Sequence, residues 1–190
     1  MSFLNFIRDS FDRVLAVDSE FCFADHTKTI QSRVVCFVYK DIFTNDVFKY
    51  WTHDKKFNEP PFDWNRVLLV PFNAVAEGHS WLHLLQGMPR NIYDTYVENA
   101  RLYKTFRSGK GALDLRTTAQ HYGIPEVMTK EHKDEMRDMV IENASYTAEQ
   151  REKILDYCLE DVELTQKIFI KQVEDIEKKN NLKTIEDYKT

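Results

Sequence analysis

Short apolar runs separated by polar turns dominate the first hundred residues. The runs from Val14 to Val17, from Val34 to Val38 and from Val67 to Val70 have almost no polar interruption. Such runs are typical of strands that are buried in a sheet. The pattern predicts strands at 13–22, 30–40, 47–52, 66–72 and 92–97, of which the first three form an antiparallel meander.

Helical spacing takes over in the second half of the chain. The pattern predicts helices at 75–86, 112–122, 129–142 and 147–179, the first with Trp81, Leu82 and Leu85 facing inward. Thr147 and Gln150 form a capping-box signature at the start of the last helix. Strands that lead into alternating strands and helices predict an α/β fold, a mixed sheet of about five strands flanked by helices.

Length and composition fit one globular domain. The chain has 190 residues, of which 43% are hydrophobic, and no run of 18 apolar residues. We expect a single domain over 1–180, a frayed tail over 181–190 and no membrane span. Cys22, Cys36 and Cys158 form no CxxC motif, which indicates buried, reduced thiols in an intracellular protein.

The net charge of −5 argues against a protein that coats nucleic acid, because such proteins usually carry a basic excess. It leaves room for an enzyme that holds a short strand, where divalent cations supply local positive charge.

The strongest chemical signal is the pair Asp18 and Glu20 in the first strand. Residues two apart in a strand point to the same face, about 6–7 Å apart. Two carboxylates on a buried face repel each other unless a cation lies between them or the strand end opens to water. The pair therefore predicts a site for a hard metal ion, with surface acids at a strand end as the alternative.

Two further places supply polar groups. Asn73 and Glu77 lie at a junction from strand to helix, and Tyr157 and Asp161 share one face of the last helix. Each has a simpler explanation: Glu77 suits a helix dipole, Asp161 suits a charged helix and Tyr157 suits a core.

The ordered set Asp18-x-Glu20, Asn73-x₃-Glu77 and Tyr157-x₃-Asp161 resembles the tyrosine branch of the DEDD exonuclease superfamily, which has an RNase H-like fold. The chain is most similar to the 3′–5′ exonuclease domain of phage and bacterial family A DNA polymerases, over about residues 13–170. One departure is clear, since Glu77 stands where the family usually has Asp. An aspartate at position 156 argues against the histidine branch of the superfamily.

The resemblance implies hydrolysis of a terminal phosphodiester with two Mg²⁺ or Mn²⁺ ions, which releases a nucleoside 5′-monophosphate. Asp18 would bridge both ions, Glu20 and Asp161 would hold the one that carries the attacking water, and Glu77 would serve the other. Tyr157 would orient the water. A role in proofreading during DNA replication follows from the same resemblance, with a polymerase domain or subunit as partner.

Substrate contacts are assigned to aromatic, amide and basic side chains. Phe21, beside the strand acids, and Asn73 are candidates, and the segment 99–111 adds Lys104, Arg107 and Lys110 next to aromatic residues. Lys130, Lys133 and Arg137 form a basic stripe, which is either a phosphate contact or a solvated helix face.

Three alternatives stay open at this point. DNA is the favoured substrate, but the same fold serves nucleases that trim RNA 3′ ends. A binding module that has lost turnover through Glu77 is the rival from another class. A zinc site at His79 and His83 lacks a third ligand at a telling spacing.

Overall fold

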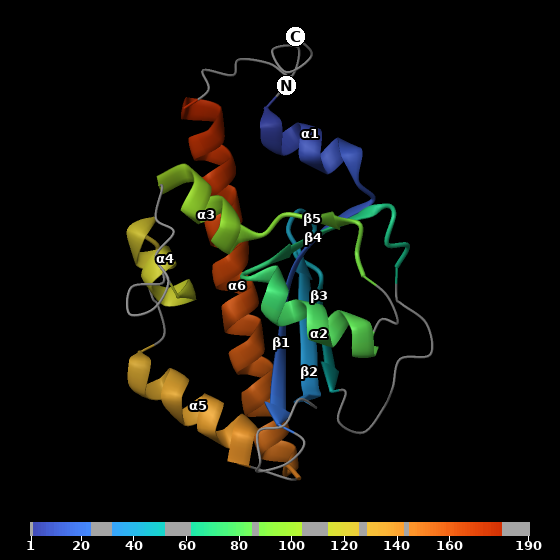
Figure 1. Ribbon diagram of the computed structural model, residues 1–190, viewed down its shortest axis with the longest axis vertical. Coiled ribbons are helices and arrows are strands. Elements are labelled where there is room, and N and C mark those ends of the chain that lie inside the picture. The colour runs from blue at the N-terminus through green and yellow to red at the C-terminus, as the bar shows by residue number, and fades with distance from the viewer. Residues whose placement is uncertain are drawn as a thin grey trace.

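A mixed five-stranded sheet with the order β3-β2-β1-β4-β5 forms the centre of the computed structural model (Figure 1). The structure describes residues 2–23, 32–51, 62–84, 88–103, 114–125, 129–142 and 145–179. The strands are β1 (Arg13–Phe23), β2 (Ser32–Asp41), β3 (Val47–Trp51), β4 (Val67–Pro71) and β5 (Asn91–Ile92).

β1 is the central strand. It pairs antiparallel with β2 and parallel with β4, while β3 pairs antiparallel with β2 and β5 pairs parallel with β4. Its residues Val14 to Val17 are fully buried because helices cover both faces of the sheet. The predicted meander, the α/β class and the RNase H-like arrangement of the sheet are thereby confirmed.

Two helices cover the two faces of the sheet. These two are α6 (Ala148–Lys179) and α2 (Ala74–Leu84). The described residues also form the helices α1 (Phe3–Ser10), α3 (Thr95–Tyr103), α4 (Leu115–His121) and α5 (Lys130–Glu142). α6 runs along one face, where Ile154, Val162 and Phe169 pack against Val14 and Ala16 (Figure 1). α2 covers the other face, where Trp81 packs among Leu15, Val17 and Phe37.

α6 begins with the predicted capping box. The Gln150 backbone N–H donates to Thr147 Oγ1 at 3.2 Å, and the Thr147 N–H donates to Gln150 Oε1 at 2.9 Å. At 32 residues the helix is about 48 Å long. It therefore reaches from α5 past the whole width of the sheet to α1 (Figure 1).

The predicted strand at 92–97 is wrong. β5 ends at Ile92, and a helix, α3, begins at Thr95. The cause is Asp94, whose Oδ1 accepts hydrogen bonds from the N–H groups of Tyr96 and Val97 and so caps the helix. The same carboxylate accepts from the N–H groups of Asn73, at 3.2 Å, and Ala74, at 2.8 Å, so it also fixes the start of α2.

Other differences are small. Trp81 is buried as predicted, but Leu82 is 57% exposed because it lies on the outer side of α2. α1, which the hydrophobic pattern does not predict, begins at Ser2, whose Oγ accepts from the Asn5 N–H. Leu85 and the predicted tail over 181–190 lie outside the described residues. In the described part of the chain, none of the helices has the length and apolar character needed to cross a membrane.

Candidate metal-binding active site

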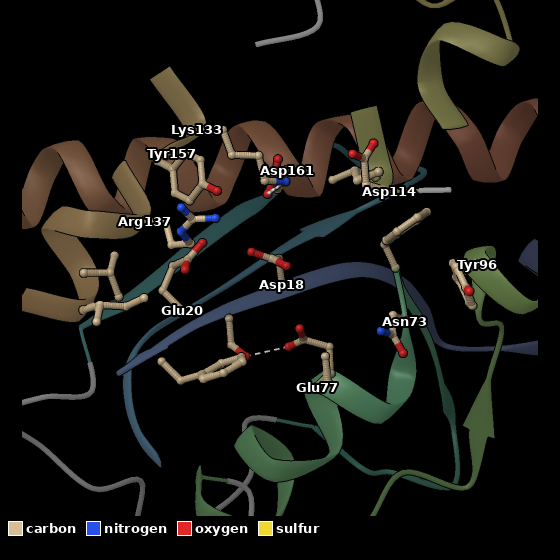
Figure 2. A pocket seen from close by; sticks show the side chains of 17 residues that line it. Asp18, Glu20, Asn73, Glu77, Tyr96, Asp114, Lys133, Arg137, Tyr157 and Asp161 are labelled. Carbon is tan, nitrogen blue, oxygen red and sulfur yellow. Dashed lines mark hydrogen bonds and ion pairs between the residues drawn. The ribbon is translucent and has the colours of Figure 1, made fainter. Parts of the chain in front are cut away.

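Three carboxylates from two distant elements of the chain meet beside β1. Asp18 and Glu20 point from β1 toward α6, and Asp161 points back from α6 (Figure 2). One oxygen atom from each of the three lies within 4.8 Å of the others. The strand spacing brings Asp18 and Glu20 to one face, and packing of α6 on that face supplies Asp161.

Glu77 approaches from the opposite side of β1. Its carboxylate is 3% exposed and does not belong to the group of three whose oxygens lie within 4.8 Å. It accepts a hydrogen bond from Ser19 Oγ at 2.5 Å, the dashed line in Figure 2. Ser19 Oγ also lies 2.5 Å from Ser80 Oγ. Because Ser19 gives its proton to Glu77, Ser80 donates to Ser19, and the three residues form one chain of hydrogen bonds.

The start of α2 places Glu77 at this point. Asn73 has a positive φ of 70°, which asparagine tolerates better than most residues. The Asn73 carbonyl accepts hydrogen bonds from the N–H groups of Ala76 and Glu77. The turn between β4 and α2 thereby directs the first helical turn toward β1.

Burial raises the pKa values of all four acids, and repulsion from other acids of the group adds to this for Asp18, Glu20 and Glu77. Burial and then Asp161 raise the pKa of Asp18 to about 8. The pKa values of Glu20 and Glu77 are raised well above their usual range, first by burial and then by Asp18. Burial also raises the pKa of Asp161, against the opposing effect of Lys133. The carboxylates thus hold their protons more tightly than free acids do, as expected where a cation would otherwise balance the charge.

Two further side chains contact the acids. The buried thiol of Cys158 donates to Asp18 Oδ2 at 3.3 Å, and the Lys133 Nζ atom of α5 lies 3.7 Å from Asp161 Oδ2. Cys158 was predicted to be a buried, reduced thiol, and it is; its contact with Asp18 was not predicted. The lysine offsets one of the charges in the cluster, so a net negative charge remains.

The acids line a cavity of about 610 Å³. Tyr157, one helical turn before Asp161, lines it as well, and its pKa is raised by burial and then by Asp161. Phe21 is 37% exposed at the rim, so it is not a core residue. The rest of the lining combines polar and apolar side chains: Ser19, Phe72, Asn73, Ala76, Tyr96, Asp114, Leu115, Lys133, Arg137, Val140 and Ile141.

The remaining predicted site residues fall into two groups. Lys133 and Arg137 of the basic stripe line the cavity, where they could contact a phosphate, and their side chains are 38% and 59% exposed. Lys104, Arg107 and Lys110 lie outside the described residues, as do the side chains of Lys130, His79 and His83. Sequence reasoning missed the contacts of Ser19 and Ser80, although strict alternation along Asp18-Ser19-Glu20 already places Ser19 on the α2 side.

The donor set suits a hard divalent cation. Carboxylate oxygens are the ligands that Mg²⁺, Mn²⁺ and Ca²⁺ prefer, and three of them converge here with an excess of negative charge. Asp18, Glu20 and Asp161 would hold such an ion. Glu77 faces the same cavity from the other side and would complete the set.

Comparison with known proteins supports the fold. No protein-family model matches the chain, and no curated protein matches it. A solved structure described as the "apo form of the nuclease" superimposes with a TM-score of 0.53 and 10% sequence identity, over 92% of this chain and 79% of that one. At this identity the likeness shows the fold alone.

Proposed function

We propose that the chain is a metal-dependent 3′–5′ exonuclease that removes nucleoside 5′-monophosphates from the ends of DNA strands. The observation that carries the proposal is the convergence of Asp18, Glu20 and Asp161 within 4.8 Å at the edge of a cavity. The motif order in the sequence and the likeness to a structure described as a nuclease support the same activity.

The cavity has the size and lining that a terminal nucleotide needs. Its volume of about 610 Å³ falls within the range of small-ligand sites. Phe21, Phe72 and Tyr96 offer aromatic surface for a base, and aromatic rings stack on nucleobases without regard to sequence. Asn73 offers an amide for hydrogen bonds to the sugar or base.

Each acid has a defined part in the proposal. Asp18, which lies between the other acids, would help to hold both ions, with Glu20 and Asp161 on one ion and Glu77 on the other. Two bound Mg²⁺ or Mn²⁺ ions would supply a hydroxide near neutral pH and stabilise the negative charge on the departing 3′-oxygen. The Tyr157 hydroxyl would hold the attacking water in line by a hydrogen bond, from the same face of α6 as Asp161.

A binding module without turnover is the second candidate, and one observation favours it. Glu77 is engaged by Ser19 and is not in the group of three whose oxygens lie within 4.8 Å. A longer acid that stays with Ser19 would leave the second ion without a ligand from α2.

The test uses single-stranded DNA labelled at the 5′ end, with Mg²⁺ or Mn²⁺. An exonuclease of this kind shortens the strand stepwise from the 3′ end and releases 5′-monophosphates, and Asp18→Ala stops it. A matched RNA strand measures sugar preference. If the wild-type chain binds DNA but releases nothing, and Glu77→Asp restores release, the binding module is the correct function.

A further inference from the structure

A second cavity, of about 460 Å³, adjoins the acidic one between α4 and α5. The two cavities share Asp114, Lys133 and Arg137 in their walls, so they lie side by side. Every residue that lines the second cavity is polar or charged, whereas the first has aromatic and aliphatic surface. The second cavity therefore favours a hydrophilic group of a ligand over a base.

The charge balance of the second cavity favours an anion. Its two acids already have partners: Asp114 Oδ1 accepts from the Thr117 N–H at 2.6 Å, and Asp134 Oδ1 pairs with Arg137 Nη2 at 3.2 Å. Arg116 and Lys133 add two further cations to the wall. Lys133 pairs with Asp161 and Arg137 pairs with Asp134, so Arg116 is the cation of this wall that has no ion-pair partner among the described residues.

Arg116 offers an unused donor. Its Nε atom is buried, yet it makes no hydrogen bond to any residue that the structure describes. Arg116 lines the second cavity, so its guanidinium can bind a ligand there without giving up a partner in the fold. The planar guanidinium matches the oxygen pairs of a phosphate better than an ammonium does.

We propose that this second cavity binds an internal phosphodiester of the substrate strand, next to the linkage that is cleaved. The proposal rests on the proposed nuclease function and adds a second point of recognition to it. Lys133 and Arg137, one turn apart on α5, form the wall between the reacting phosphate and its neighbour. Arg116 at the start of α4 holds the neighbouring phosphate from the far side.

The proposal makes strand length a determinant of affinity. A mononucleotide ester fills the acidic cavity alone, whereas an oligonucleotide fills both cavities. Arg116 lines the second cavity and not the first, so its replacement separates the two contributions.

The experiment compares Arg116→Gln with the wild-type chain on two ligands. One is the p-nitrophenyl ester of thymidine 5′-monophosphate, and the other is a fluorescent single-stranded DNA, bound in Ca²⁺ and cleaved in Mn²⁺. Arg116→Lys tests whether charge without the planar fork suffices. Arg8→Gln, an exposed arginine on α1 at the opposite end of the molecule from α5, is the matched control (Figure 1).

We expect Arg116→Gln to weaken oligonucleotide binding about 10-fold, the loss of one charge-assisted hydrogen bond. The slope of log affinity against log salt becomes shallower by about 0.7, the value for one single-strand phosphate contact. Ester cleavage and the melting temperature stay unchanged, and Arg116→Lys recovers part of the affinity. A single neutral methylphosphonate at the neighbouring linkage weakens DNA binding by the wild type as much as Arg116→Gln does. In Arg116→Gln the same methylphosphonate causes no further loss of affinity.

The outcomes separate the two proposals. If wild type cleaves neither ligand yet binds DNA through Arg116, the second cavity stands and the nuclease function fails. If wild type cleaves both and Arg116→Gln binds DNA as tightly as Arg8→Gln, with no change in salt slope, the second cavity is not a phosphate site.

Discussion

Ser19, the residue between the two strand acids, donates a hydrogen bond of 2.5 Å to Glu77. Its neighbours Asp18 and Glu20 face α6, so Ser19 faces α2 and meets the acid that comes from that helix. The segment from Asp18 to Glu20 thus lies beside acidic residues on both sides of the strand, Asp161 of α6 and Glu77 of α2. This contact also suits a glutamate at position 77, since the additional methylene extends its carboxylate further from α2 than an aspartate would reach.

Loss of the Ser19 hydroxyl is expected to loosen Glu77. We expect Ser19→Ala to lower the free energy of unfolding of the metal-free chain by about 1–3 kcal/mol, because a buried carboxyl group loses its donor. Affinity for Mn²⁺, measured by calorimetry, falls about 10-fold, as for other residues that orient a ligand. Ser80→Ala has a smaller effect, since Ser80 contacts Ser19 and not the carboxylate.

A double-mutant cycle provides the control for this prediction. If Ser19 acts through Glu77, the effects of Ser19→Ala and Glu77→Gln on metal affinity are not additive. Additive effects would mean that the hydroxyl has no part in orienting the acid.

Glu160 is a suitable control for Asp161, because it directly precedes Asp161 on α6 and its side chain is exposed. We expect Asp161→Asn to reduce cleavage at least about 100-fold, the scale on which loss of a group that stabilises transition-state charge is felt. The metal-free melting temperature does not fall, since a buried charge is removed. Glu160→Gln leaves the rate unchanged; equal rates in both variants would remove Asp161 from the site.

The raised pKa values set a pH dependence of stability. Asp18 has a pKa of about 8 in the fold and 3.8 as a free group, so the native state binds more protons between these values. Stability of the metal-free chain therefore falls as pH rises from about 5 to 8. Each 1 kcal/mol of lost stability lowers the melting temperature by about 2–4 °C in a chain of this size.

Metal reverses that trend, because a cation binds the deprotonated acids. Scanning calorimetry in EDTA and in Mn²⁺ over this pH range measures both effects. Asp18→Asn should flatten the metal-free curve. A metal-free wild type that gains stability from pH 5 to 8 would contradict the raised pKa.

Tyr157 is expected to act on the water and not on the metal. Tyr157→Phe slows strand cleavage about 10- to 100-fold, less than the loss of a full general base, and leaves Mn²⁺ affinity unchanged. Tyr93→Phe is a matched control, since the buried Tyr93 hydroxyl has no partner among the described residues and does not line the cavity. An unaltered rate in Tyr157→Phe would end the water-orienting role.

Sequence patterns predict β1 and α6, which carry Asp18, Glu20 and Asp161, because each element has a clear hydrophobic pattern. The run from Val14 to Val17 is apolar throughout, as a strand covered on both faces must be. The capping box at Thr147 fixes the start of α6, and the spacing of four between Tyr157 and Asp161 then fixes their common face.

Local side-chain chemistry explains what the patterns missed. Asp94 lies in an apolar segment that looks like a strand, but its carboxylate caps α3 and α2 together. Only the fold brings those two helix ends to one residue. Contacts such as Cys158 with Asp18 and Lys133 with Asp161 join residues far apart in sequence, so no period reveals them.

The alternation of Asp18, Ser19 and Glu20 ties the chemistry of the site to the pairing of the sheet. A slip of β1 by one residue would turn the hydroxyl toward α6 and both carboxylates toward the apolar layer around Trp81. Two carboxylates would then be buried among apolar side chains, without a partner from either helix. An error in strand alignment would thus cost free energy twice, once in lost ladder hydrogen bonds and once in desolvated charge, so the three side chains proposed to serve the reaction also favour the correct alignment of the central strand.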